Sequence, residues 1–191
     1  KILCHNHYET GKYNKNKTYL HDKEYARALD TIVKACVDIL LTDSKGKILL
    51  GKRIIKPYND WWYIGGRMKT GESIEDTAKR HIKNDTSLEI SSERLVFISS
   101  NTLIWDERLQ EPSKNGTCDI NTVMTVKLTD EEISKLKYSE KEYSEFKLWE
   151  REQILNGDFH QALKDSVLSI IMNEKLEKLK ESVLQNKDDI Y

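Results

Sequence analysis

Residues 65–90 read GGRMKTGESIEDTAKRHIKNDTSLEI, and this stretch decides how the chain folds. Its glycines permit backbone conformations that other residues avoid, and they let the main chain pass close to a ligand. Ser73 follows as an N-cap, with Asp76 three residues later in the place of the usual capping-box glutamate. We therefore expect a glycine-rich loop that leads into a helix over residues 74–86.

The expected helix carries two kinds of side chain on different faces. Ile74, Ala78 and Ile82 recur at helical spacing and form an apolar stripe. His81 and Asp85 lie four residues apart, so they project together from a neighbouring face. A carboxylate beside backbone carbonyls supplies the oxygen ligands that Mg²⁺ prefers, whereas His81 is better explained as a solvated neighbour of Asp85 than as a ligand. Such a loop and helix are also common without any site, so the rest of the chain must decide.

The composition excludes several classes of protein. The chain has 191 residues, enough for one domain with a core and some extra elements. Charged residues make up 33% but leave a net charge of -1, which gives no overall positive field for nucleic acid. Apolar runs fall far short of the roughly 20 residues that cross a membrane. Three widely spaced cysteines, Cys4, Cys36 and Cys118, argue against a disulfide framework and for a reducing, cytoplasmic location.

The order of elements indicates an α+β domain. A short helix is expected around the sequence KEYARALD, and two β-rich runs at residues 31–41 and 47–53 flank the turn SKGK as a hairpin. Further strands are expected at residues 61–64, 95–105, 120–128 and 146–149, with a capping box at 129–132 that opens a short helix. Because strands and helices mix without βαβ regularity, we expect a sandwich around a mixed sheet.

The two ends of the chain differ from its middle. We divide the chain into a polar arm at residues 1–20, a domain at 21–158 and a C-terminal amphipathic helix within 159–191. The apolar positions of that helix, at near-helical spacing, are Ala162, Leu163, Val167, Ile170, Ile171, Leu176, Leu179 and Val183. Packing on the domain or on a second subunit explains this stripe.

Residues 65–90 resemble the Nudix box. That pattern is a glycine, five residues, a glutamate, seven residues, then Arg-Glu-aliphatic-any-Glu-Glu-any-Gly-aliphatic. Five residues keep its register: Gly66, Glu72, Arg80, Ile82 and Leu88. The three glutamates after the arginine and the second glycine are replaced by His81, Asn84, Asp85 and Ser87. A cluster of several magnesium ions is therefore not expected, and one metal ion is.

Over residues 19–160 the chain is similar to the GDP-mannose mannosyl hydrolase branch of the Nudix superfamily. The matching pieces are EYARALDTIVKACVDILL, DSKGKILLGKR, WWYIGGR, the box and NGDFH. The resemblance implies a Nudix-type α/β/α sandwich around a mixed β-sheet, here with an extra C-terminal helix. It also implies one Mg²⁺, a homodimer with its contact near residues 25–32, and a nucleoside diphosphate sugar as substrate. Water attacks the anomeric carbon of the sugar in that branch, and nucleoside diphosphate is released.

The resemblance assigns roles to residues by position. Asp38 and Arg53 match residues that orient the substrate and stabilise the leaving diphosphate, and Arg67 matches an arginine near the nucleotide. The backbone carbonyl of Gly65 and the carboxylate of Asp85 match magnesium ligands. These roles are coherent, because arginines and a divalent ion stabilise the negative charge that grows on a departing diphosphate.

The chain departs from the branch before the last expected strand. A metal-binding glutamine followed by a histidine base stands there in the branch, whereas this chain has Glu142 and Tyr143. Glutamate can replace glutamine as an oxygen ligand, but tyrosine, with an ordinary pKa of about 10, is a poor base near neutrality. Glu140, Glu142 or Glu145 is the alternative base. Arg80 is expected to brace the box.

Three functions stay open. The first is hydrolysis of a nucleoside diphosphate sugar at the sugar carbon. The second is ordinary pyrophosphohydrolysis at phosphorus, with Glu72 and the acidic residues 140–145. The third is a catalytically silent Nudix fold that binds a nucleotide sugar or a protein partner, which the missing glutamates and histidines would support.

Overall fold

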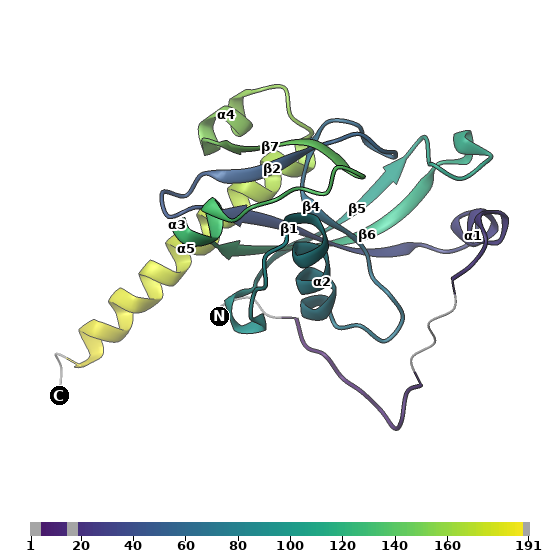
Figure 1. Cartoon of the computed structure of the whole chain (residues 1–191). Coiled ribbons are helices and arrows are strands. Elements are labelled where there is room, and N and C mark those ends of the chain that lie inside the picture. Colours follow the sequence, from purple (N-terminus) through teal and green to yellow (C-terminus); the bar gives the residue numbers. More distant parts are fainter. Residues whose placement is uncertain (1–4, 15–18, 189–191) are drawn as a thin grey trace.

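The computed structural model describes residues 5–14 and 19–188, and its centre is one seven-stranded mixed sheet (Figure 1). The strand order is β3-β2-β1-β6-β5, and β4 and β7 pair with β1 and β2 respectively. The strands are β1 (Lys34–Thr42), β2 (Ile48–Arg53), β3 (Trp61–Trp62), β4 (Ile64–Arg67), β5 (Val96–Trp105), β6 (Thr117–Lys127) and β7 (Tyr143–Trp149). The helices are α1 (Asp22–Leu29), α2 (Ile74–Thr86), α3 (Asp130–Ser134), α4 (Arg151–Asn156) and α5 (Gln161–Asp188), with short 3₁₀ turns at Ser92–Arg94 and Ser113–Asn115.

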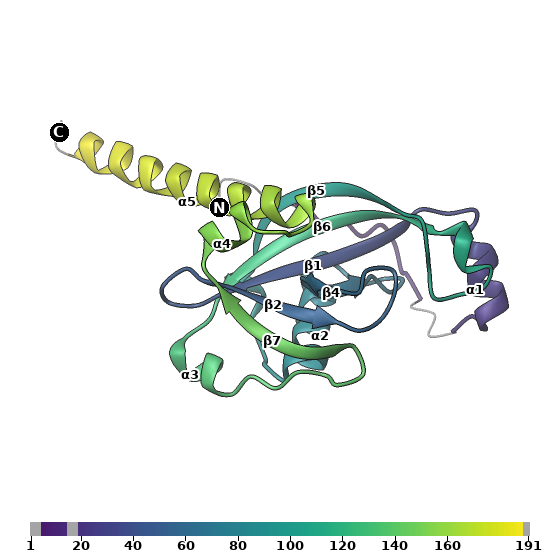
Figure 2. The same ribbon diagram turned by 90° about the horizontal axis from the view of Figure 1, so that it is seen from above.

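The sheet separates two hydrophobic cores, because side chains of its central strand alternate between the two faces. On one face Val37 and Ile39 of β1 share a core with Ile82 of α2. On the other face Leu40 shares a core with Val167 of α5. Figure 2 shows α2 and α5 on opposite sides of the sheet. The expected sandwich of helix, mixed sheet and helix is thereby confirmed.

Helix α2 has the bounds that the sequence predicts. Ser73 caps it, since its hydroxyl accepts a hydrogen bond from the Asp76 amide at 3.0 Å. The helix ends at Thr86, and its C-cap residue Ser87 has a left-handed backbone with φ of 63°. Ser87 stands where the Nudix box has its second glycine, and this conformation explains why a glycine suits that position.

Strand β7 is longer than expected and begins at Tyr143, not at residue 146. It pairs with β2 along its length, and the last partner pair is Arg53 with Tyr143, after an irregularity between Lys52 and Arg53. The expected loop residue Tyr143 is therefore part of the sheet. Helix α4 was not expected at all, although Glu150 and Gln153 form a capping box at its start.

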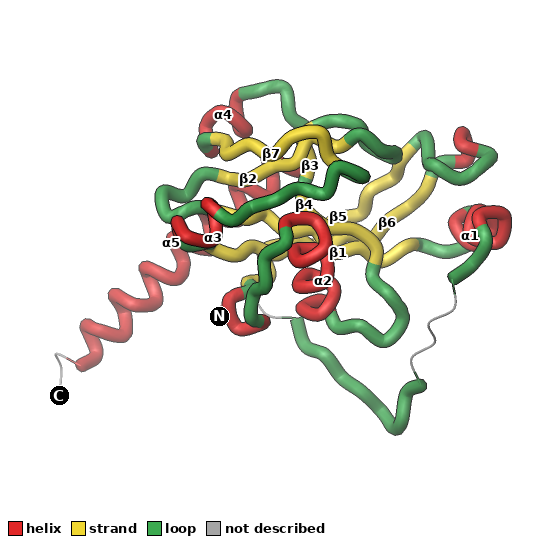
Figure 3. The backbone as a smooth tube through the Cα atoms, in the orientation of Figure 1, coloured by secondary structure: helices red, strands yellow, loops and turns green. Residues whose placement is uncertain are grey.

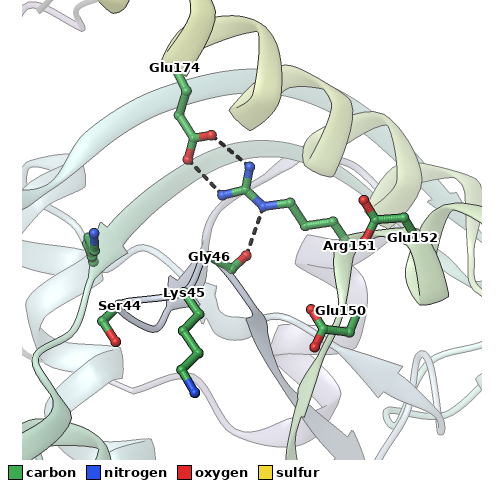
Figure 4. Close-up of a pocket in the computed structure, with 8 residues that line it drawn as sticks. Ser44, Lys45, Gly46, Glu150, Arg151, Glu152 and Glu174 are labelled. Atoms are coloured by element: carbon green, nitrogen blue, oxygen red, sulfur yellow. Dashed lines mark hydrogen bonds and ion pairs between the residues drawn. The ribbon is translucent and has the colours of Figure 1, made fainter.

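Three elements that are distant in sequence meet at Arg151. Its guanidinium forms two 2.7 Å hydrogen bonds with the carboxylate of Glu174 in α5, and its Nε donates to the carbonyl of Gly46 at 2.8 Å (Figure 4). This contact fixes α4 and α5 to the β1–β2 turn. Beyond it, the last turns of α5 leave the body of the protein (Figures 1 and 2).

At the other end of the sheet, α1 lies near the turn between β5 and β6 (Figure 3). Cys36 is buried and Cys118 half-buried, both as free thiols, and Cys4 lies outside the described residues. In the part of the chain that the structure describes, no helix is both long and apolar enough to cross a membrane.

Candidate active site

A cleft of about 400 Å³ opens between α1, strands β1, β4 and β6, and the loop that joins β5 to β6. Most of the residues singled out in the sequence meet in its wall. Those that line the cleft are Asp38, Arg53, Gly65, Arg67 and Glu142, together with Gly66 and His81. Asp85 and Tyr143 do not line it; they are 4% and 1% exposed and lie behind His81.

The two glycines let strand β4 pack tightly against its neighbours. Gly65 pairs with Asp38 of β1 and has a φ of 148°. A Cβ atom on Gly65 would stand 2.3 Å from the carbonyl oxygen of Val37, and one on Gly66 would stand 3.1 Å from the ring of His81. Any side chain at Gly65 would therefore push β4 away from β1 and distort the cleft wall.

Asp38 is a buried carboxyl group on the cleft wall. Its Oδ2 accepts a hydrogen bond from Asn121 of β6 at 3.0 Å. Burial raises the pKa of Asp38 to about 6, although Arg53 and His81 pull it down. Two polar atoms beside it, Oδ1 of Asn121 and Nε of Arg53, are buried without a hydrogen-bond partner. Unpaired buried polar atoms are costly, so these groups are suited to a polar ligand.

The pairing of β2 with β7 brings Glu142 next to Arg53. Arg53 is the register partner of Tyr143, and the amide of Ile54 donates to the carbonyl of Glu142 at 3.0 Å. Burial raises the pKa of Glu142, and the charge of Asp85 raises it further, while Arg53 opposes both. Two carboxylates thus crowd each other at this end of the cleft.

Asp85 occupies the last turn of α2 and is held from two sides. His81 Nδ1 lies 3.7 Å from its Oδ2, as the four-residue spacing predicts, and the hydroxyl of Tyr143 donates to the same oxygen at 3.4 Å. Burial raises the pKa of Tyr143 well above its usual range. Tyr143 is therefore placed to position Asp85, and its phenol is unsuited to accept a proton from water.

Arg80 and Glu72 form the brace of the box. Two hydrogen bonds of 2.7 Å join the guanidinium to the carboxylate, and Arg80 also donates to the carbonyl of Arg67 at 3.0 Å. Glu72 accepts further bonds from the hydroxyl of Thr77 and the amide of Lys69. Burial would raise the pKa of Glu72, but these donors lower it to about 2. Glu72 is thus a structural residue here.

The metal-binding capacity of the site is small. Among residues 5–14 and 19–188, no group of three or more His, Cys, Asp and Glu side chains is arranged to hold a metal ion. Two carboxylates that interact with each other, Asp85 and Glu142, remain, and Glu142 lines the same cleft as Gly65. The loop that carries Glu142 rests on the end of α2, since the amide of Ser139 donates to the Asp85 carbonyl at 3.1 Å. These oxygen atoms suit one hard cation.

The far end of the cleft contains residues that the sequence analysis missed. Arg108 is only 2% exposed, yet its Nη2 has no hydrogen-bond partner. No local pattern marks it, because the loop of residues 106–116 reads only as polar. Asp119 and Asn121 could have been found, since polar residues alternate on β6 at positions 117, 119 and 121, which gives the strand a buried polar face.

Charge differs between the two ends of the cleft. Each cation at the far end has an acidic partner: Arg108 with Asp30 at 2.7 Å, Lys34 with Asp119 at 3.1 Å, and Lys56 with Glu107 at 2.5 Å. Within the described residues, neither Arg53 nor Arg67 forms an ion pair, although Arg67 stacks on the ring of Tyr25 at 4.6 Å. At the end that holds the glycines, Arg53 and Arg67 thus form no ion pair among the described residues, although the carboxyl groups of Asp38 and Glu142 interact with the charge of Arg53.

A model of the NUDIX domain family matches residues 33–169, which include the sheet, α2 and most of the cleft. The chain belongs to the Nudix family. Similar solved structures include a MutT protein from Methanosarcina mazei Go1 (18% identity, 75% of this chain, 96% of that chain, TM-score 0.60). Others are the E. coli dihydroneopterin triphosphate pyrophosphohydrolase (14%, 75%, 99%, TM-score 0.55) and the NUDIX domain of Shewanella oneidensis NrtR complexed with ADP ribose (17%, 80%, 99%, TM-score 0.53). At these identities the likeness shows the Nudix fold.

Proposed function

We propose that this Nudix protein is a Mg²⁺-dependent hydrolase of nucleoside diphosphate sugars that cleaves at the anomeric carbon. The position of Arg53 and Arg67 in the cleft, where neither forms an ion pair among the described residues, supports this proposal most directly. Two guanidinium groups that are not engaged in ion pairs suit a diphosphate, which carries growing negative charge as its bond to the sugar breaks. The charge-balanced far end suits a neutral group linked to that diphosphate.

We infer that the chain binds one magnesium ion. Asp85, Glu142 and the backbone carbonyl of Gly65 are the proposed ligands, and their crowded carboxylates would be relieved by a cation. Bound Mg²⁺ supplies positive charge beside the departing diphosphate. The small number of carboxylates suits a reaction at carbon, where the ion has only the leaving group to stabilise.

The chain supplies the remaining groups of the proposed reaction. Asp38 and Asn121 bind sugar hydroxyls and orient the ring. Of the three alternative bases in residues 140–145, only Glu142 lines the cleft. We propose that Glu142 accepts the proton of the attacking water, in addition to being a magnesium ligand. The water oxygen bonds to the anomeric carbon, its proton passes to Glu142, and the electron pair of the broken carbon–oxygen bond leaves with the diphosphate on Arg53 and Arg67.

The test is a product assay with GDP-mannose and related sugar nucleotides in the presence of Mg²⁺. Free sugar and nucleoside diphosphate are the expected products. In water enriched in heavy oxygen, the label should enter the sugar. Nucleoside monophosphate with sugar phosphate, and label in phosphate, would refute attack at carbon.

Attack at phosphorus is the second candidate. The similarity to a triphosphate pyrophosphohydrolase and to a Nudix domain bound to ADP ribose favours it. In one version of this mechanism Glu72 is a catalytic group. The two hydrogen bonds from Arg80 to the Glu72 carboxylate argue against that version.

A silent binding protein is the third candidate, favoured by the lack of a larger acidic cluster within the described residues. A thermal shift with nucleotide sugar, but no turnover at high protein concentration, would establish it. Magnesium-dependent turnover that Asp85→Ala abolishes would exclude it.

A further inference from the structure

Arg108 lines the far end of the cleft and is only 2% exposed. Its Nε donates a hydrogen bond to the carbonyl of Gln110 at 3.0 Å. Its Nη1 donates to the carboxylate of Asp30 at 2.7 Å and to the carbonyl of Gly116 at 3.1 Å, so the N–H groups of Nε and Nη1 are occupied. Nη2 has no hydrogen-bond partner in the part of the chain that the structure describes. The N–H groups on Nη2 therefore remain available to donate.

The fold alone does not account for this nitrogen. The contacts with Asp30, Gln110 and Gly116 already hold the guanidinium group in place, so the loop needs no further acceptor. A buried donor without an acceptor is costly, and proteins normally satisfy such groups. Because Arg108 lines the cleft, a molecule bound in the cleft can supply the acceptor.

An aromatic surface borders this end of the cleft. It consists of Tyr58, Trp62 and Trp105, whose ring centroids lie between 4.9 and 5.7 Å from one another. Tyr58 and Trp105 are only half-buried, so their rings keep accessible surface. The loop of Tyr58 is joined to the loop of Arg108, since Nζ of Lys56 donates to the hydroxyl of Ser113 at 3.2 Å. A flat ring can therefore stack beside the Arg108 donor.

Asp119 supplies an acceptor at the same end. It lines the cleft and is 5% exposed. Its Oδ2 accepts a hydrogen bond from Nε1 of Trp105 at 3.1 Å, and its Oδ1 lies 3.1 Å from Lys34 and 3.4 Å from the hydroxyl of Thr117. A carboxylate oxygen accepts about two hydrogen bonds, so Oδ2 keeps capacity for a donor on a ligand.

A heterocyclic base with a lactam edge fits this set of groups. A base stacks on aromatic side chains through its flat ring. In guanine, hypoxanthine and uracil a ring carbonyl stands beside a ring N–H, and this edge accepts from Arg108 and donates to Asp119. Adenine and cytosine present an amino group beside an unprotonated ring nitrogen, so the amino donor would face the donor of Arg108.

We propose that Arg108 and Asp119 select a nucleobase with a lactam edge at the far end of the cleft. This assignment rests on the proposed function, which places the diphosphate on Arg53 and Arg67. The base is then the neutral group that the charge-balanced far end receives. Arg108 is a specificity-determining residue in this arrangement and takes no part in bond breaking.

The sugar and the base contact different walls of the cleft. Asp38 and Asn121, the proposed sugar contacts, belong to strands β1 and β6 of the sheet. Tyr58 and Arg108 belong to the loops that follow β2 and β5. A substrate that bends at its diphosphate can reach both walls.

The test is a calorimetric titration of the whole chain with nucleoside diphosphates in the presence of Mg²⁺. GDP and IDP should bind about tenfold or more tightly than ADP, and UDP should bind more tightly than CDP. The ribose and diphosphate are the same throughout, so only the base differs. IDP lacks the exocyclic amino group of GDP and therefore isolates the lactam edge. Equal binding of GDP, IDP and ADP, or a preference for ADP, would overturn the proposal without any variant.

Arg108→Lys tests the assigned donor. Lysine keeps a positive charge for Asp30 but has no second guanidinium nitrogen, so the affinity ratio of GDP to ADP should fall to within about twofold. A purely structural loss would weaken both nucleotides and leave their ratio unchanged. Arg94→Lys is the matched control, because Arg94 pairs with Glu132 and does not line the cleft, and its ratio should equal that of the wild type. An unchanged ratio in folded Arg108→Lys would overturn the role of Arg108.

Tyr58→Leu tests the stacking surface. Loss of the ring should weaken every nucleotide several-fold and leave the ratio of GDP to ADP unchanged, since stacking does not read the edge of the base. Tyr138→Leu is the control, because Tyr138 is 42% exposed and does not line the cleft. Wild-type affinity in Tyr58→Leu would overturn the placement of the base against this ring.

Binding of nucleoside diphosphates does not require hydrolysis, so failure of this proposal and failure of the proposed function give different results. A lactam preference without cleavage at the anomeric carbon would support the base site and overturn the proposed reaction. Cleavage at carbon with equal kcat/KM for sugar nucleotides of every base would support the reaction and overturn the base site.

Discussion

The hydroxyl of Tyr143 donates to Oδ2 of Asp85 at 3.4 Å, so the first residue of β7 holds the last turn of α2. The two residues are 58 positions apart in the sequence. The pairing of Tyr143 with Arg53 fixes the position of the Tyr143 hydroxyl along strand β2. The proposed cation ligand thus depends on the register of an edge of the sheet. Its position is decided by strand pairing as much as by the Nudix box.

Tyr143→Phe tests this relationship. The ring keeps its packing and only the bond to Asp85 is lost, so the free energy of unfolding should fall by about 0.5–1.5 kcal/mol. Turnover of the sugar nucleotide should fall by less than about tenfold, with a higher Mg²⁺ concentration needed for half-maximal rate. A loss of about a thousandfold or more would show that Tyr143 is the base after all.

Glu142→Gln separates the two roles proposed for Glu142. Glutamine keeps an oxygen ligand but cannot accept a proton, so kcat should fall by about 100-fold or more with little change in magnesium dependence. Glu142→Ala removes both functions and should also weaken magnesium binding. Glu145→Gln is the matched control, because Glu145 is exposed and does not line the cleft, and its activity should equal that of the wild type. Full activity of Glu142→Gln would assign the proton to another group.

The Arg80 brace predicts a specific loss of stability in acid. The folded-state pKa of Glu72 is about 2, below the usual 4.5, so its contribution to folding is complete above pH 4.5 and is lost as pH falls from 4.5 toward 2. Glu72→Gln should cost about 1–2 kcal/mol at neutral pH and flatten this part of the stability curve, measured by urea unfolding. An unchanged acid profile would contradict the brace.

Glu132 provides the control for that experiment. Arg94 holds the pKa of Glu132 at about 2 in the same way, although burial acts against it, but this pair joins α3 to residues before β5 and does not line the cleft. Glu132→Gln should reduce acid stability and leave KM unchanged. Glu72→Gln should reduce stability and raise KM, because the brace also holds the Arg67 carbonyl.

Ser87→Gly should stabilise the protein. Ser87 is the one non-glycine residue with positive φ among those described, and glycine adopts that conformation without the steric cost of a Cβ atom. We expect a gain of about 0.5–1 kcal/mol in the free energy of unfolding, seen as a higher urea midpoint. Ser91→Gly is the control, since Ser91 has a φ of -77° and glycine there should give no gain. A lower midpoint for Ser87→Gly would show that the serine hydroxyl contributes more than the strain costs.

Local signals explain which elements the sequence predicts well. The bounds of α2 follow from the cap at Ser73 and from the apolar stripe, all within one short segment. Arg53 and Arg67 lie close to glycines in the sequence, whereas Asp38 was assigned by its position in the family resemblance. For α2 and the two arginines, the neighbours in sequence carry the information.

Contacts between distant segments explain what the sequence did not reveal. Residues 139–145 are polar and indicate a loop, but pairing with β2 includes Tyr143 in the sheet, where its hydroxyl contacts Asp85. The buried Arg108 forms a hydrogen bond with Asp30, at the end of α1 and 78 positions away, as well as with carbonyls of its own loop. The sequence around Tyr143 and around Arg108 predicts neither of these contacts.

The distribution of ion pairs along the cleft has a consequence for how a ligand enters. At one end the cations form ion pairs with Asp30, Asp119 and Glu107, and at the other end Arg53 and Arg67 form none among the described residues. The proposed substrate carries its negative charge on a central diphosphate and has a neutral sugar on one side. The electrostatic field of the cleft therefore rotates this substrate before it contacts the cleft wall. The protein would thereby turn its ligand to one polarity during approach, and raising the ionic strength should slow capture without changing the fit of the docked molecule.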